Sequence, residues 1–122
     1  MGRLNPGRRA ALKALIAVES GAHAEDELTR LAPKAGPDRG LAWHLCLGTL
    51  RVQGSIDRSL SPHLRKPIDQ LDPAVRCALR LGTFECALSR TPGRAAVDQA
   101  VEAVRSVGYG RASGFVNAIM RK

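Results

Sequence analysis

Aromatic residues are scarce in this chain, and their scarcity limits the kinds of surface it can present. Phe, Tyr and Trp together make up 3% of the 122 residues. Proteins that hold splayed nucleic-acid bases need aromatic side chains at intervals as stacking platforms. Any nucleic acid that binds here would therefore be held mainly through its phosphates and its shape.

Long apolar runs are also missing. No stretch approaches the roughly 20 apolar residues of a membrane-spanning helix, and residues 1–6 are polar and basic with no apolar segment after them. We therefore expect neither membrane insertion nor secretion. The three cysteines are an odd number without close pairing, and each falls within an apolar helical pattern. This arrangement indicates buried thiols in a reducing compartment, the cytoplasm by default.

Patterns typical of catalysis and metal binding are absent as well. The three histidines are far apart. His44 and Cys46 are two positions apart, so their side chains would face different directions on a helix. Asp98 and Glu102 have helical spacing, but arginines flank them, which favours a solvated ion-paired face over acid–base catalysis. No glycine-rich phosphate loop or activated nucleophile is recognisable. We expect no catalytic residue, no metal and no cofactor.

What is present is apolar periodicity of the helical kind, which predicts an all-α fold in one domain over residues 1–122. Hydrophobic residues make up 44% and charged residues 25% of the chain, as in ordinary folded proteins. No period-two pattern of a strand occurs. The predicted helices cover residues 6–20, 24–31, 38–60, 73–86, 91–108 and 112–120.

Several residues mark the ends of these helices. Asn5 followed by Pro6 is typical of an N-cap and the first helical residue. Gly21 can adopt the left-handed conformation that ends a helix. Asp38 is the expected N-cap of the long third helix, and Gly54 is expected to kink it.

A short motif occurs twice, at residues 45–50 and again at 79–84. A repeat of 34 residues is typical of helical solenoids, but such folds need at least about three copies, and no third copy is found. We interpret the two segments as core helices that present Gly48 and Gly82 where backbones approach closely.

Positive charge is concentrated at the N-terminus of a chain whose net charge is +8 and whose pI is about 10.5. Arg3, Arg8, Arg9 and Lys13 carry four positive charges, and no acid lies among them. A cation near a helix N-terminus costs about 0.3 to 1 kcal/mol, which a bound phosphate would offset. We predict that these four residues contact RNA phosphates; a solvated, flexible terminus is the alternative.

Arg76 and Arg80 are further candidates for RNA contacts. They form a like-charge pair at i,i+4 spacing, which costs roughly 0.2 to 0.5 kcal/mol. Arg80 can instead pair with Asp72, Glu85 or a carboxylate of another helix. We favour this structural interpretation over RNA contact.

Six segments together carry a resemblance to a known family, although none is specific alone. They resemble the NusB-like domain, the helical RNA-binding fold of bacterial transcription antitermination factors. The segments are residues 8–12, 38–51, 71–73, 79–85, 95–102 and 114–118.

The resemblance implies six or seven helices in two packed sub-bundles, with the arginine-rich first helix toward ribosomal or leader-transcript RNA. Some of the motifs look closer to the version fused in front of small-subunit ribosomal RNA cytosine methyltransferases. In those enzymes the catalytic cysteine and the S-adenosylmethionine site lie in a following domain, and this chain stops at Lys122. We therefore expect an RNA-binding accessory domain that is not itself an enzyme.

The resemblance also implies protein partners, namely a small-subunit ribosomal protein or a methyltransferase domain. Two alternatives to the RNA-binding function stay open at this point. The domain can be a protein-interaction module whose charge serves only solubility. It can also be the isolated N-terminal domain of a ribosomal RNA methyltransferase.

Overall fold

Seven α-helices form the part of the chain that this computed structural model describes, residues 4–89 and 91–121, and no strand occurs there. The all-α prediction is confirmed. The helices are α1 (Pro6–Glu19), α2 (Ala24–Leu31), α3 (Pro37–Arg51), α4 (Gln53–Leu60), α5 (Pro73–Leu88), α6 (Gly93–Ser106) and α7 (Ser113–Met120). Short 3-10 helices are η1 (Ser61–His63), η2 (Ile68–Gln70) and η3 (Gly110–Ala112).

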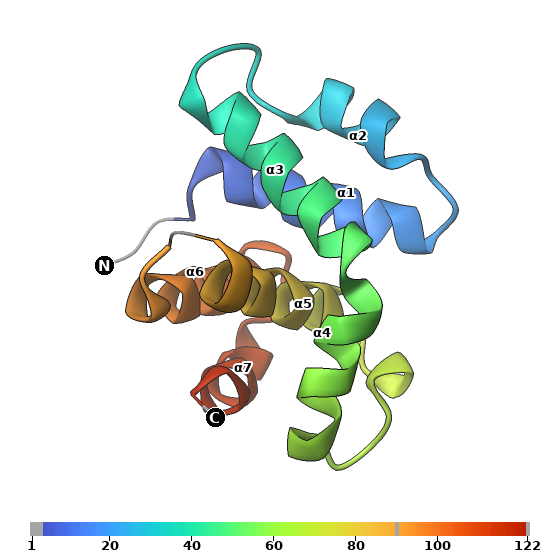
Figure 1. Ribbon diagram of the computed structural model, residues 1–122, viewed down its shortest axis with the longest axis vertical. Helices are drawn as coiled ribbons and strands as arrows, with labels where there is room; N and C mark the ends of the chain where they lie inside the picture. Colours follow the sequence, from blue (N-terminus) through green and yellow to red (C-terminus); the bar gives the residue numbers. More distant parts are fainter. Residues whose placement is uncertain (1–3, 90, 122) are drawn as a thin grey trace.

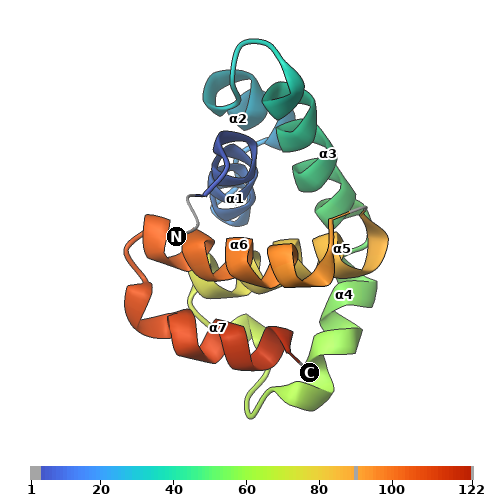
Figure 2. The ribbon, with the colours of Figure 1, turned by 90° about the vertical axis from the view of Figure 1, so that its left-hand side faces the viewer.

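The helices pack as two sub-bundles, as predicted (Figures 1 and 2). In the N-terminal sub-bundle α3 crosses α1, and α2 packs against both. The C-terminal sub-bundle contains α4 to α7, with α5 and α6 packed together and α7 beneath them. Helix α5 also contacts α1 and α3, so it contributes to both cores. Its buried apolar residues include Val75, Ala78, Leu79, Leu81 and Phe84.

Helix α1 begins at the predicted cap. The Asn5 side-chain oxygen accepts hydrogen bonds from the backbone N–H groups of Gly7 at 2.7 Å and Arg8 at 3.2 Å. The Asn5 amide nitrogen donates to Asp38 Oδ1 at 3.0 Å. The prediction that Asp38 is the N-cap of α3 is wrong; the cap is Gly36, with a φ of 86°. The aspartate instead ties the start of α3 to the start of α1.

The predicted long third helix is two helices, and the break lies at Val52 rather than at Gly54. Val52 has φ −112° and ψ 20°, and α4 begins at the next residue. A negative φ is open to any residue, so the break needs no glycine and leaves no glycine signature in the sequence. After the break, Ile56 and Leu60 enter the hydrophobic core.

The cysteines differ in burial more than their sequence patterns indicate. Cys46 and Cys77 are buried, and burial raises the pKa of their thiols to about 11 and about 12. Cys86 is exposed, so the prediction of three buried thiols is wrong for this residue. It lies in the last turn of α5, where Ala87 and Leu88 are exposed too.

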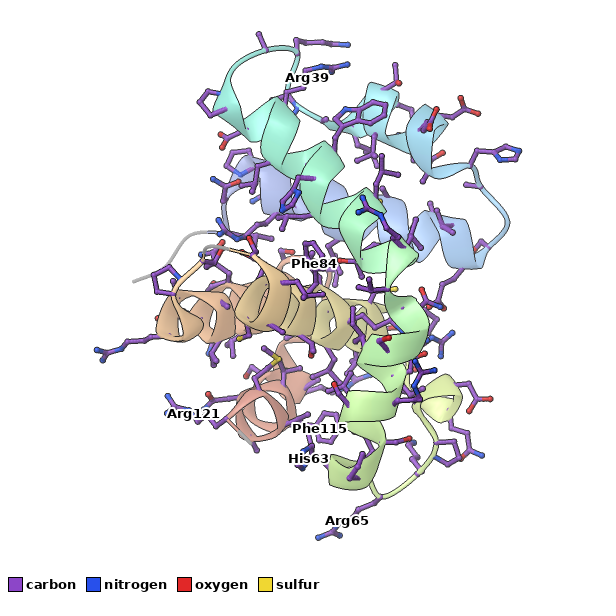
Figure 3. All side chains as sticks on the ribbon, in the orientation of Figure 1. Arg39, His63, Arg65, Phe84, Phe115 and Arg121 are labelled. Atoms are coloured by element: carbon purple, nitrogen blue, oxygen red, sulfur yellow. The ribbon has the colours of Figure 1, made fainter. Side chains whose placement is uncertain are left out.

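The glycines of the repeated motif make room for side chains rather than for a neighbouring backbone. A Cβ atom at Gly48 would lie 2.3 Å from Cζ of Phe84, which belongs to the second copy of the motif. Phe84 is labelled in Figure 3. A Cβ atom at Gly82 would lie 2.9 Å from the terminal carbon of Met120 and 3.0 Å from Cβ of Ala100. Gly48 therefore lets α5 place an aromatic ring against α3.

The surroundings of two glycines in α3 predict that alanine substitutions there have opposite effects on stability. Gly48→Ala should lower the free energy of unfolding by about 1 to 3 kcal/mol, because the added methyl group overlaps the Phe84 ring. Gly40→Ala should raise it by up to about 1 kcal/mol, since a methyl group there would meet no other atom within 4 Å and alanine favours helix. Urea unfolding followed by circular dichroism measures both, and an unchanged midpoint for Gly48→Ala would contradict the packing.

Candidate nucleic-acid interface

Arg8, the first described residue of the predicted RNA-binding set, is held inside the fold. Its Nε and Nη2 atoms donate to the two carboxylate oxygens of Glu85, each at 2.8 Å. The Thr91 hydroxyl donates to the same carboxylate at 2.7 Å. The Glu85 side chain is 2% exposed and that of Arg8 15%. The guanidinium is therefore committed to a bidentate ion pair between α1 and α5, and we do not retain Arg8 in the interface.

Arg9 and Lys13 have a different environment. Both are exposed, and neither forms an ion pair with any described residue. They are four residues apart, which places them on one face of α1. These two side chains form what we call the α1 basic stripe. Among the described residues that we predicted to bind RNA, Arg9 and Lys13 are the two whose charge is free to meet an external anion.

The first-turn amides of α1 are largely occupied. Asn5 Oδ1 accepts from the N–H groups of Gly7 and Arg8, and the Asn5 carbonyl accepts from the N–H of Arg9. The helix terminus therefore offers few free donors to a phosphate, contrary to what its capping sequence suggests. An anion on α1 would be held by the side chains of the stripe.

Arg76 and Arg80 are brought together, but by carboxylates of other helices. Arg76 forms an ion pair with Glu19 of α1. Arg80 donates to Glu19 at 2.9 Å and, through Nε and Nη2, to Asp57 of α4 at 2.8 and 2.9 Å. Arg80 is 8% exposed. Its partners are thus carboxylates from two other helices, rather than Asp72 or Glu85.

Glu19 is the centre of this cluster. Burial raises the pKa of the Glu19 carboxyl. Hydrogen bonds from Arg76 and Cys77 and the charges of Arg76 and Arg80 lower this pKa, and together they outweigh the effect of burial. The net result is a pKa below the ordinary glutamate value. Glu19 is therefore a carboxylate under ordinary conditions, and it stabilises the two arginines that the sequence analysis offered as RNA contacts.

The remaining predicted site residue, Arg3, lies outside the described residues. Glu19 and Asp57 were not named from the sequence, and Glu85 was named as a partner of Arg80 rather than of Arg8. Glu19 did leave a signal, because it is the last residue of α1, where the helix dipole disfavours a negative charge. An acid in that position needs a cation from elsewhere, just as a cation at an N-terminus needs an anion.

Two further features bear on the kinds of function available. The described residues contain no group of three or more His, Cys, Asp or Glu side chains placed to hold a metal ion. None of the described helices combines the length and the apolar character needed to cross a membrane.

Comparison with known proteins decides the family. The model of the NusB family matches residues 5–122, which is nearly the whole chain. The chain belongs to the NusB family. This membership confirms the resemblance found in the sequence, and the two sub-bundles described above are the form that the NusB domain takes here.

Relatives of two kinds share this domain. Ribosomal RNA small subunit methyltransferase B of Xanthomonas campestris is 32% identical over 118 residues, which cover 94% of this chain and 27% of that protein. Transcription antitermination protein NusB of Shewanella woodyi is 33% identical over 79 residues, which cover 64% of this chain and 59% of that protein. The chain thus spans about a quarter of the length of the methyltransferase.

A solved structure extends the comparison to three dimensions. The fold matches a chain in the crystal structure of antitermination factors NusB and NusE in complex with double-stranded RNA, with a TM-score of 0.83 and 26% identity. The match covers 96% of this chain and 92% of that chain.

The different environments of the neighbouring arginines predict different costs of removing them. Arg8→Ala leaves the Glu85 carboxylate buried without its cation and should lower the free energy of unfolding by about 3 to 5 kcal/mol. Arg9→Ala removes an exposed charge and should change it by less than about 0.5 kcal/mol. Urea unfolding separates the two. Equal midpoints for the two variants would contradict the different environments of the two arginines.

The Glu19 cluster predicts a loss of stability in acid. The pKa of Glu19 is lower in the folded protein than in the unfolded chain, where it is about 4.3. The ionised carboxylate therefore stabilises the fold above about pH 4.3, and this stabilisation is lost as the pH falls through the pKa of the folded state. Glu19→Gln should lower the free energy of unfolding by on the order of 2 kcal/mol at neutral pH. The difference from wild type should shrink below about pH 4. Glu25→Gln, at an exposed site in α2, is the control, and a pH-independent difference for Glu19→Gln would refute the assignment.

Proposed function

We propose that this protein is an RNA-binding accessory domain that acts on ribosomal RNA or its nascent transcript and has no catalytic activity of its own. Its contacts are to RNA phosphates, through Arg9 and Lys13 of the α1 basic stripe. The observation that carries the proposal is the pair of exposed, unpaired cations on one face of α1, in a domain of the NusB family. The fold matches a chain in a crystal structure that also contains double-stranded RNA, and this match supports RNA as the ligand.

Electrostatics favours this stripe over the other predicted cations. Arg8, Arg76 and Arg80 are already neutralised by Glu85, Glu19 and Asp57, so releasing any of them toward RNA would leave a carboxylate without its partner. Arg9 and Lys13 can meet a phosphate without breaking an existing interaction. Phosphate contacts of this kind position RNA but do not read its sequence.

One observation favours a specific setting for the domain, namely ribosomal RNA methylation. Alignment with methyltransferase relatives extends over 94 to 98% of this chain, whereas alignment with the NusB proteins extends over 64 to 71%. We propose that the domain holds ribosomal RNA for a methyltransferase domain in the cytoplasm. An antitermination role with a small-subunit ribosomal protein is the second candidate, supported by the solved complex of NusB with NusE.

The proposal predicts a salt-dependent affinity for RNA that depends on the α1 basic stripe. For a short single-stranded RNA, two phosphate contacts contribute about −1.4 to the slope of log K against log salt concentration. Arg9→Ala/Lys13→Ala should lower the affinity at low salt and make the slope less steep by about that amount. Fluorescence anisotropy with labelled RNA, single-stranded and duplex, measures both quantities.

The matched control is Arg51→Ala/Arg58→Ala, which removes two exposed cations from α3 and α4. It has the same change in net charge as the stripe variant, so it reports the effect of overall charge alone. Equal losses of affinity in the two double variants would reject the α1 basic stripe as the RNA site.

A further inference from the structure

The C-terminal sub-bundle carries an open apolar groove that the proposed RNA contacts do not use. It has a volume of about 550 Å³ and lies between α7 and the segment that follows α4. In Figure 3 Phe115 and His63 lie between α7 and the lower end of α4. We call this the α7 groove; its apolar lining is Leu64, Leu71, Phe115, Ala118 and Ile119.

Helix α7 carries apolar side chains on a second face, beside the face that packs into the hydrophobic core. Val116 and Ile119 are buried, and they attach the helix to the sub-bundle. Phe115, Ala118 and Ile119 have i, i+3 and i+4 spacing and line the groove on a neighbouring face. Phe115 is 40% exposed, and among the described large apolar side chains only Leu88 is also classed as exposed. A phenyl ring left open beside a groove is typical of a surface that binds another molecule.

The charged residues of the groove are all of one kind. Arg65 and Lys66 line it together with His63, and no Asp or Glu contributes to its lining. Both cations are exposed, and neither forms an ion pair with a described residue. The groove therefore combines an apolar floor with a positive rim, which is complementary to an apolar molecule that carries negative charges beside its contact face.

We propose that the α7 groove binds an acidic amphipathic helix of another protein. Apolar side chains of that helix pack against Phe115, Ala118 and Leu64, and its carboxylates face Arg65 and Lys66. This is the way in which amphipathic helices bind hydrophobic grooves, through side chains at i, i+3, i+4 and i+7. The proposal does not depend on RNA binding, because the α1 basic stripe lies in the other sub-bundle.

The lining favours a protein over a nucleic acid as the occupant. Phe115 is the one aromatic ring of the apolar lining, and the other four apolar residues are aliphatic. Against them, the donors and acceptors on the edge of an RNA base would lose their bonds to water. Leucine or isoleucine side chains have no such groups to satisfy. RNA is nevertheless the alternative that the experiment must be able to detect.

The test uses two synthetic helical peptides and the full chain labelled with ¹⁵N. One peptide carries leucine on one face and glutamate beside it; the other has lysine in place of every glutamate. The acidic peptide should shift amide resonances of residues 61–72 and 113–120, and the basic peptide should bind at least about tenfold more weakly. Equal affinities, or shifts confined to other residues, would overturn the proposal.

Variants of the groove sharpen the test. Ala118→Glu places a carboxylate at an exposed position of the groove and should weaken the acidic peptide about tenfold or more. Arg65→Glu/Lys66→Glu should reverse the preference between the two peptides. Leu88→Ser, which removes an exposed leucine at the end of α5, is the matched control and should bind like wild type. If both groove variants keep full affinity, the site lies elsewhere.

RNA binding by the same variants separates this proposal from the proposed function. Ala118→Glu should leave the affinity for single-stranded RNA unchanged, whereas Arg9→Ala/Lys13→Ala should lower it. Loss of RNA affinity in Ala118→Glu, without binding of the acidic peptide to wild type, would assign the groove to RNA and overturn the protein partner.

Discussion

Ion pairs at both ends of α1 hold it against α5, and this contact joins the two sub-bundles. Near its start, Arg8 meets Glu85; at its last residue, Glu19 meets Arg76 and Arg80. Arg8 and Arg76 lie near the N-terminal ends of their helices and Glu19 and Glu85 near the C-terminal ends, where the helix dipole disfavours them, whereas Arg80 lies in the middle of α5. Because the two helices run in opposite directions, each supplies the charge that the other needs.

This arrangement explains why the N-terminal arginines look like a single cluster in the sequence but serve two purposes. Neighbouring residues of a helix point about 100° apart. Arg8 therefore faces α5 while Arg9 faces outward, and Lys13 follows Arg9 one turn later. The helix dipole disfavours a cation at Arg8, and from the sequence we predicted an RNA phosphate as the compensating anion. The anion is a buried glutamate 77 residues further along the chain.

The parts of the fold that sequence could predict are those set by local patterns. The Asn5 cap and the bounds of α2 depend on residues close in the chain, and both are as predicted. The break at Val52 and the partners of Arg8 and Arg80 depend on contacts between distant segments, which a single sequence does not show. For the interface, helical spacing places Arg9 and Lys13 on one face of α1. Which of the predicted cations are free of an ion pair depends on Glu19 and Glu85, which lie far from them in the sequence.

The cost of desolvating these charges bears on what the ion pairs achieve. Moving a guanidinium and a carboxylate out of water offsets much of their attraction, so a buried pair adds less stability than its short distances suggest. If α1 were rotated or shifted along α5, several charges would be buried without a partner, and each buried unpaired charge costs several kcal/mol. We infer that the pairs chiefly fix the rotation of α1 against α5. Since that rotation also decides which way Arg9 and Lys13 point, the buried charges set the orientation of the exposed ones, and the proposed RNA contact depends on residues that never touch RNA.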